Sequence, residues 1–81
     1  STLFLLWEVF SQAVKRSAAG IVFVHNHPSG NPEPSEEDIK TTERLVACGK
    51  LLGIVVIDHI IIGDGQYCSM QSLGLMDVMT D

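Results

Sequence analysis

The chain has 81 residues, 46% of them hydrophobic, so it can form one small core but not two domains. Ten Asp and Glu stand against five Lys and Arg, a formal net charge of −5. Nucleic-acid binding needs Lys and Arg to neutralise phosphates, so we expect no direct DNA or RNA binding by this segment.

Cysteine usage and the short apolar stretch near the start indicate the compartment. Cys48 and Cys68 are the only two cysteines and form no Cys-x-x-Cys pair, so neither a disulfide scaffold nor a Cys-rich zinc knuckle is indicated. Residues 3–7 are apolar but too short to span a bilayer, and they lack the features of a signal peptide. We therefore expect a reduced, cytoplasmic protein.

The first half of the chain predicts a helix, a strand and a stiff loop. Residues 3–18 carry apolar side chains at helical spacing and predict an amphipathic helix, with Gly20 as its C-cap. This helix has an apolar first turn with almost no chain before it, so we expect the chain to begin inside a larger domain. Residues 21–24 predict a buried central strand that runs into His25. Three prolines and a glycine make residues 26–34 a conformationally restricted loop.

The second half predicts a helix followed by a hairpin. Ser35 is the predicted N-cap, acids occupy the next turn, and Gly53 ends the helix. Residues 54–62 and 66–69 read as two strands joined by a glycine-rich turn, and residues 70–81 could form one short helix. This order favours an α/β (α+β) architecture, a mixed sheet with helices on both faces or on one.

A candidate metal site lies between the first strand and the second helix. His25 and His27 are two residues apart on a strand end, so both imidazoles can project to one face. Asp38 lies three residues after Ser35, near the positive end of the helix dipole, where its carboxylate stays ionised. Two imidazoles and one carboxylate suit zinc and leave a fourth position for water.

Such a centre is suited to amide hydrolysis. A zinc-bound water has its pKa lowered to about 7, and the ion polarises a scissile carbonyl. A carboxylate beside the water is then needed to move protons. Spacing alone leaves a structural alternative open, in which the histidines bond to backbone groups and Asp38 only caps its helix.

The same stretch carries a family resemblance. Residues 25–38 read His-Asn-His-Pro-Ser-Gly-Asn-Pro-Glu-Pro-Ser-Glu-Glu-Asp, which resembles the JAMM metallohydrolase motif and, in the wording of the loop, most closely the RadC family. Residues 18–20, 52–54 and 58–59 are also similar, and the resemblance covers most of residues 8–74. It implies a cytidine-deaminase-like JAMM/MPN fold, present here as one N-terminally truncated domain over residues 1–81.

The resemblance also implies residue roles. His25, His27 and Asp38 would bind Zn²⁺, and Ser35 would be a catalytic residue that holds the oxyanion of a tetrahedral intermediate. Its other interpretation is the helix N-cap, and the two roles can coexist. JAMM enzymes use a glutamate upstream of the first helix as general acid/base. Glu8 does not match that residue, so this fragment is expected to lack it.

We therefore predict a zinc metallopeptidase, a protease or hydrolase of peptide or isopeptide-type amide bonds with an unidentified protein or peptide substrate. One alternative is a non-catalytic zinc-binding interaction module, and another is the DNA-repair role suggested by the family name. The apolar first turn of the chain suggests a homodimer. Asp58 and His59 interrupt an apolar strand, and we interpret them as a buried hydrogen-bonded pair, or His59 as a residue supporting the metal site.

Overall fold

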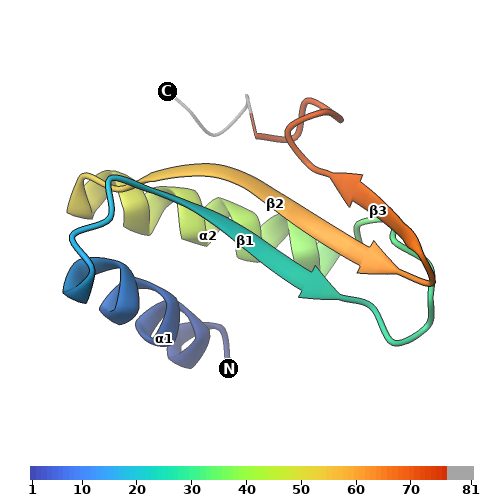
Figure 1. Ribbon diagram of the computed structural model, residues 1–81, viewed down its shortest axis with the longest axis horizontal. Helices are drawn as coiled ribbons and strands as arrows, with labels where there is room; N and C mark the ends of the chain where they lie inside the picture. The colour runs from blue at the N-terminus through green and yellow to red at the C-terminus, as the bar shows by residue number, and fades with distance from the viewer. Residues whose placement is uncertain (77–81) are drawn as a thin grey trace.

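A computed structural model describes residues 1–76 of the chain, with two helices and three strands (Figure 1). The elements are α1 (Thr2–Lys15), β1 (Gly20–Asn26), α2 (Glu36–Leu52), β2 (Val55–Gly63) and β3 (Gln66–Ser69). The predicted order of helix, strand, helix, strand, strand is confirmed. Within these residues, neither helix has the length and apolar character that a membrane crossing requires.

The three strands form one mixed sheet in the order β1-β2-β3. β1 and β2 are parallel, with α2 in the connection, and β2 and β3 form the predicted antiparallel hairpin. The register of β1 and β2 shifts once, since Ile21 pairs with Val56 and the next residue, Val22, pairs with Asp58. This bulge skips Ile57 and changes which β2 residues face the helices.

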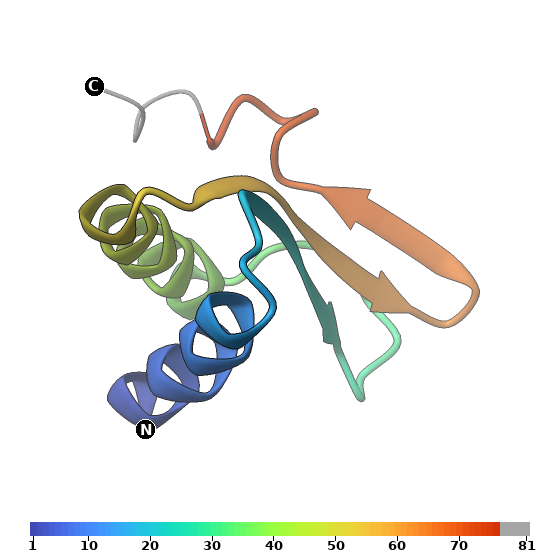
Figure 2. The ribbon, with the colours of Figure 1, turned by 60° about the vertical axis from the view of Figure 1, so that its left-hand side comes forward.

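Both helices lie on the same face of the sheet (Figure 2). One core cluster joins Phe10 and Ala13 of α1, Leu45 of α2 and Phe23 of β1. A second cluster joins α2 to β2 and to the chain after β3, through Val46, Ile61, Met70 and Met76. The sequence left open whether the helices share a face, and the single cluster contributed by α1, α2 and β1 settles it.

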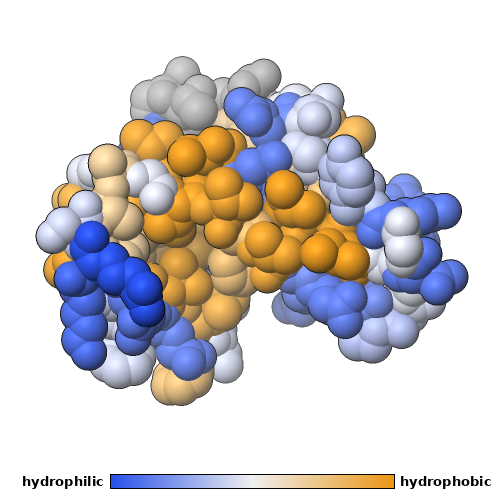
Figure 3. Space-filling view, viewed as in Figure 1, coloured by the Kyte–Doolittle hydropathy of each residue, from blue (hydrophilic) through white to orange (hydrophobic). Residues whose placement is uncertain are grey.

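The opposite face of the sheet is apolar and uncovered within the described residues. Four β-branched side chains of β1 and β2 are between 42% and 55% exposed there: Val22, Val24, Ile57 and Ile62. Figure 3 shows an apolar surface in the middle of the molecule in the same view as Figure 1. The prediction of a buried central strand at residues 21–24 was therefore wrong: β1 is half-buried on one face and exposed on the other, and among the described strands it lies at the edge of the sheet, with β2 in the centre.

Several predicted boundaries were wrong. α1 ends at Lys15 with Arg16 as its C-cap, and Gly20 opens β1 instead of capping the helix. A Cβ at residue 20 would lie 3.0 Å from the Ile57 side chain, so this glycine serves the close pairing of β1 and β2. Residues 70–76 form successive turns and not a helix, while residues 77–81 of the predicted tail helix lie outside the described residues.

Candidate metal centre

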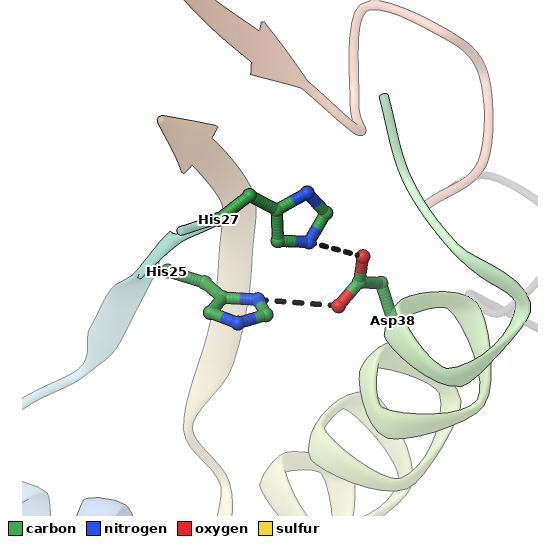
Figure 4. A group of neighbouring side chains, drawn as sticks. All are labelled: His25, His27 and Asp38. Atoms are coloured by element: carbon green, nitrogen blue, oxygen red, sulfur yellow. Dashed lines mark hydrogen bonds and ion pairs between the residues drawn. The ribbon is translucent and has the colours of Figure 1, made fainter. Parts of the chain in front are cut away.

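The end of β1 and the first turn of α2 bring three potential ligands together. His25 lies within β1, and His27 follows the strand directly, with its backbone N–H donating to the Ile62 carbonyl at 2.8 Å. This bond continues the ladder with β2, so both imidazoles project to the same side, as predicted. Figure 4 shows both rings directed at the Asp38 carboxylate of α2.

The distances suit one metal ion. His25 Nδ1 lies 3.1 Å from Asp38 Oδ1, and His27 Nε2 lies 2.8 Å from Asp38 Oδ2. One ligand atom from each of the three residues falls within 4.8 Å of the others. Zinc bonds of about 2.0–2.1 Å place tetrahedral ligand atoms roughly 3.4 Å apart, so small side-chain rotations would accommodate the ion.

The hydrogen bonds of His27 support a cation at this place. Its Nδ1 lies 2.8 Å from the Asn31 carbonyl oxygen, which can only accept, so Nδ1 carries the proton. Its Nε2 faces the Asp38 carboxylate, which also only accepts when ionised. A neutral imidazole has one N–H and cannot satisfy both contacts. Either His27 is an imidazolium or a metal ion takes the place of the second proton, and the donor set fits the metal.

Asp38 is held as an ionised group by the start of its own helix. The Ser35 backbone N–H donates to Asp38 Oδ2 at 2.8 Å, and the Asp38 backbone N–H donates to Ser35 Oγ at 3.1 Å, which forms a capping box. Burial by itself would raise the pKa of Asp38, but hydrogen bonding by Ser35 and the nearby His25 and His27 hold its pKa below the usual value. The carboxylate is therefore ready to bind a cation at neutral pH.

Ser35 is the N-cap of α2, as one of its two interpretations predicted. Its backbone N–H is occupied by Asp38, so any contact with a bound substrate would fall to its hydroxyl. The catalytic role implied by the resemblance stays a prediction.

The loop between β1 and α2 is held against the β2–β3 turn. Gly30 adopts a left-handed φ of +86°, and its carbonyl oxygen lies so near Gly63 that a Cβ there would approach it to 2.5 Å. The Glu33 backbone N–H donates to Asn31 Oδ1 at 3.1 Å. These contacts hold the Asn31 carbonyl, and through it the His27 ring.

Asp58 is a buried polar residue of β2. Asp58 accepts hydrogen bonds from the Ser69 hydroxyl and from the backbone N–H groups of His59 and Gln71. Burial alone would raise the pKa of Asp58, but these three hydrogen bonds outweigh it and hold its pKa below the usual value. The predicted hydrogen-bonded pair is therefore present only in part, since Asp58 bonds the backbone N–H of His59 and not its ring, and His59 Nε2 has no hydrogen-bond partner among the described residues.

His59 is 1% exposed and is neutral at physiological pH, because burial lowers its pKa to about 4. Its Nδ1 lies 2.6 Å from the hydroxyl of Thr42, a fully buried residue that sequence reasoning missed. The available signal was the spacing of Thr42 four residues after Asp38, which places both on one side of α2.

Comparison with known proteins agrees with this geometry. Residues 1–75 match the family described as the RadC-like JAB domain. The chain is 61% identical over 69 residues to a UPF0758 protein of Alkaliphilus metalliredigens, 56% identical over 69 residues to one of Syntrophomonas wolfei and 58% identical over 69 residues to one of Methanosarcina mazei. Each match covers 85% of this chain but only 29–30% of the relative, so the chain spans about three tenths of the length of these proteins. With nearly the whole chain matched, the protein belongs to the RadC-like JAB domain family.

Proposed function

We propose that the protein containing this chain is a zinc-dependent hydrolase of peptide or isopeptide-type amide bonds. The observation that carries the proposal is the position of His27 between two hydrogen-bond acceptors, the Asn31 carbonyl and the Asp38 carboxylate. Zinc bound there would supply a water of lowered pKa and polarise a carbonyl. Three protein ligands leave the fourth position open, which is the arrangement of catalytic and not of structural zinc sites.

The residues of this chain would bind the metal ion and orient its ligands. His25, His27 and Asp38 are the ligands, the Asn31 carbonyl orients the His27 ring, and the Ser35 N–H orients the Asp38 carboxylate. His25 is the most exposed of the three ligands, with 38% of its side chain accessible, so a substrate would approach from its side. The proton shuttle is the glutamate that the family resemblance implies upstream of this segment.

The test uses the full-length natural protein that contains these residues, purified without chelators. Its zinc content is measured, and it is incubated with a mixed peptide pool whose products are identified by mass spectrometry. Asp38→Asn removes a ligand, while Asp64→Asn removes the same charge in the exposed β2–β3 turn and serves as the matched control. We expect cleavage by the parent and by Asp64→Asn, and none by Asp38→Asn or after chelation.

Two outcomes would argue for other conclusions. One zinc per chain without cleavage of any peptide would favour the non-catalytic zinc-binding module over the hydrolase. Cleavage that persists in Asp38→Asn and in chelator would show that the activity does not depend on this centre, and the proposal would be wrong.

A further inference from the structure

His59 touches both of the elements that carry the ligands. It pairs with Phe23 in the β1–β2 register, and its ring meets the Phe23 ring edge-on with centroids 4.8 Å apart. The same ring stacks on His25 at a centroid distance of 5.9 Å and an interplanar angle of 27°. The ring of the strand ligand His25 therefore rests against a fully enclosed side chain of β2.

The other contact of His59 leads to α2. Its Nδ1 lies 2.6 Å from Thr42 Oγ1, and that hydroxyl also lies 2.8 Å from the backbone carbonyl oxygen of Asp38. The hydroxyl has one proton to donate. The carbonyl is a better acceptor than the Met70 sulfur, 3.3 Å away, and a helical Thr commonly bonds back to the fourth preceding residue. Thr42 then accepts a hydrogen bond from His59 Nδ1–H.

This arrangement links Asp38 to β2 through hydrogen bonds and His25 to β2 through ring stacking. His59 Nε2 is buried without a hydrogen-bond partner among the described residues, an arrangement that lowers stability and that an apolar side chain would avoid. The imidazole is thus poorly explained by packing alone. Its hydrogen bond with Thr42 and its stacking on His25 both lead to the candidate metal centre.

We infer that Thr42 and His59 are positioning residues, which hold the helix ligand Asp38 and the strand ligand His25 at the spacing that one metal ion requires. The inference rests on the proposed metal site but not on hydrolysis. Neither residue belongs to the ligand group itself, which consists of His25, His27 and Asp38. Their effect is therefore expected on metal affinity and ligand geometry.

The experiment compares variants of the full-length protein that contains this chain. Thr42→Val keeps the side-chain shape but removes the hydroxyl, and Thr42→Ser restores the hydroxyl and serves as its matched control. His59→Phe keeps a ring against His25 but removes Nδ1. Zinc affinity is measured by competition with a chromophoric chelator, the ligand geometry by the visible spectrum of the Co²⁺ form, and the stability of the metal-free protein by urea unfolding.

We expect Thr42→Val to weaken zinc binding by about 10- to 100-fold, the range found when a residue behind a metal ligand is lost. The zinc affinity of Thr42→Ser should stay within about threefold of that of the parent. The double variant Thr42→Val/His59→Phe should lose less zinc affinity than the product of the two single-variant losses, because both substitutions break the same hydrogen bond. The Co²⁺ spectrum should change in Thr42→Val and be restored in Thr42→Ser.

Zinc affinity and a Co²⁺ spectrum unchanged in Thr42→Val would overturn the inference, even where unfolding shows lower stability. If His59→Phe fails to fold, the comparison of Thr42→Val with Thr42→Ser still decides. A parent that binds zinc and responds to Thr42→Val but cleaves nothing would refute the hydrolase and leave the inference standing. A parent that binds no metal would overturn both.

Discussion

His27 Nε2 lies 2.8 Å from Asp38 Oδ2, an oxygen that also accepts a hydrogen bond from the Ser35 backbone N–H. The proton of a neutral His27 ring is on Nδ1, where it is donated to the Asn31 carbonyl, so none is left for Nε2. The pair is therefore short of one positive charge unless His27 is an imidazolium. A metal ion supplies that charge without a second proton on the ring.

The first prediction concerns metal content. We expect one zinc per chain in the protein purified without chelator, and loss of that zinc in both His27→Ala and Asp38→Asn. Removing a ligand should cost more than the roughly 10- to 100-fold in affinity that residues behind a ligand cost. Elemental analysis measures the zinc content and competition with a chelator measures the zinc affinity, with Asp64→Asn as the charge-matched control. Full zinc occupancy in either ligand variant would contradict the assigned ligand set.

The second prediction separates the two roles of Ser35. Ser35→Ala removes the acceptor for the Asp38 backbone N–H and should lower the free energy of unfolding by about 1 kcal/mol in urea titrations. Ser35→Asn restores an N-cap and should recover most of that stability. If the hydroxyl also contacts substrate, Ser35→Asn should remain impaired in peptide cleavage. Ser11→Ala, within α1, is the matched control and should be neutral or slightly stabilising.

The candidate metal ligands His25, His27 and Asp38 could be predicted from the sequence because the patterns that reveal them are local. The spacing of His25 and His27 on a strand end and the Ser35–Asp38 capping box each need only a few neighbouring residues, and the structure contains both features. The predicted end of α1 was wrong because the chain turns after the Arg16 cap at Ser17, which has a positive φ, and not at a glycine. Residues that fall on no local pattern are harder to foresee.

Two features depended on contacts between distant segments and could not be predicted. Thr42 meets His59 only because a bulge skips Ile57 and turns His59 toward α2. Trp7 is an apolar residue of the amphipathic helix, yet it is 67% exposed, since α1 contributes Phe10 and Ala13 to the core instead. The direction of a helix face is decided by its partner element, which the amphipathic pattern of one helix does not identify.

The third prediction is a pH dependence from Asp58. Because its pKa is lower in the folded protein than its ordinary value of 3.8, the carboxylate contributes stability that is present above that value and lost as pH falls through the folded pKa. Asp58→Asn removes this contribution. The parent should therefore be more stable than Asp58→Asn by about 1–3 kcal/mol near pH 7. This difference should shrink progressively below about pH 5.

Urea unfolding of both proteins between pH 3 and pH 7 measures this difference. The titratable neighbours of Asp58 are His59, whose pKa of about 4 falls in the same range, and Cys68, whose pKa is raised by burial and by Asp58 and Glu33, so it stays neutral in acid. His59 is present in both proteins, so the comparison between them isolates Asp58 to a first approximation. Asp64→Asn should run parallel to the parent at every pH. A difference that stays constant down to pH 3 would show that Asp58 is not the group responsible.

The fourth prediction addresses self-association of the isolated 81-residue chain. An apolar groove of about 950 Å³ lies between α1 and α2, and Leu3, Phe4 and Trp7 on its rim are 59–77% exposed. A second copy is the partner we expect there, because large exposed apolar surfaces associate. Phe4→Gln/Trp7→Gln should weaken the dimer in sedimentation experiments and barely affect monomer stability. If Val22→Thr/Val24→Thr weakens it instead, the open sheet face is the contact and the groove is not.

The last prediction tests the close approach of α2 to the chain that leads into β2. Gly49 is buried in the last turns of α2, and a Cβ there would lie 2.3 Å from the Ile54 carbonyl oxygen, a backbone atom that cannot move aside cheaply. Ala is favoured over Gly inside a helix by about 1 kcal/mol, so propensity alone would make Gly49→Ala stabilising. We expect the clash to dominate and the variant to lose about 1–3 kcal/mol in urea unfolding. Ala47→Gly, at an exposed position on the same helix, is the reciprocal control and should lose about 1 kcal/mol. A Gly49→Ala protein as stable as the parent would mean that α2 can shift away from Ile54, and the spacing that positions Asp38 and Thr42 over the sheet would then be less constrained than the contacts of Gly49 indicate.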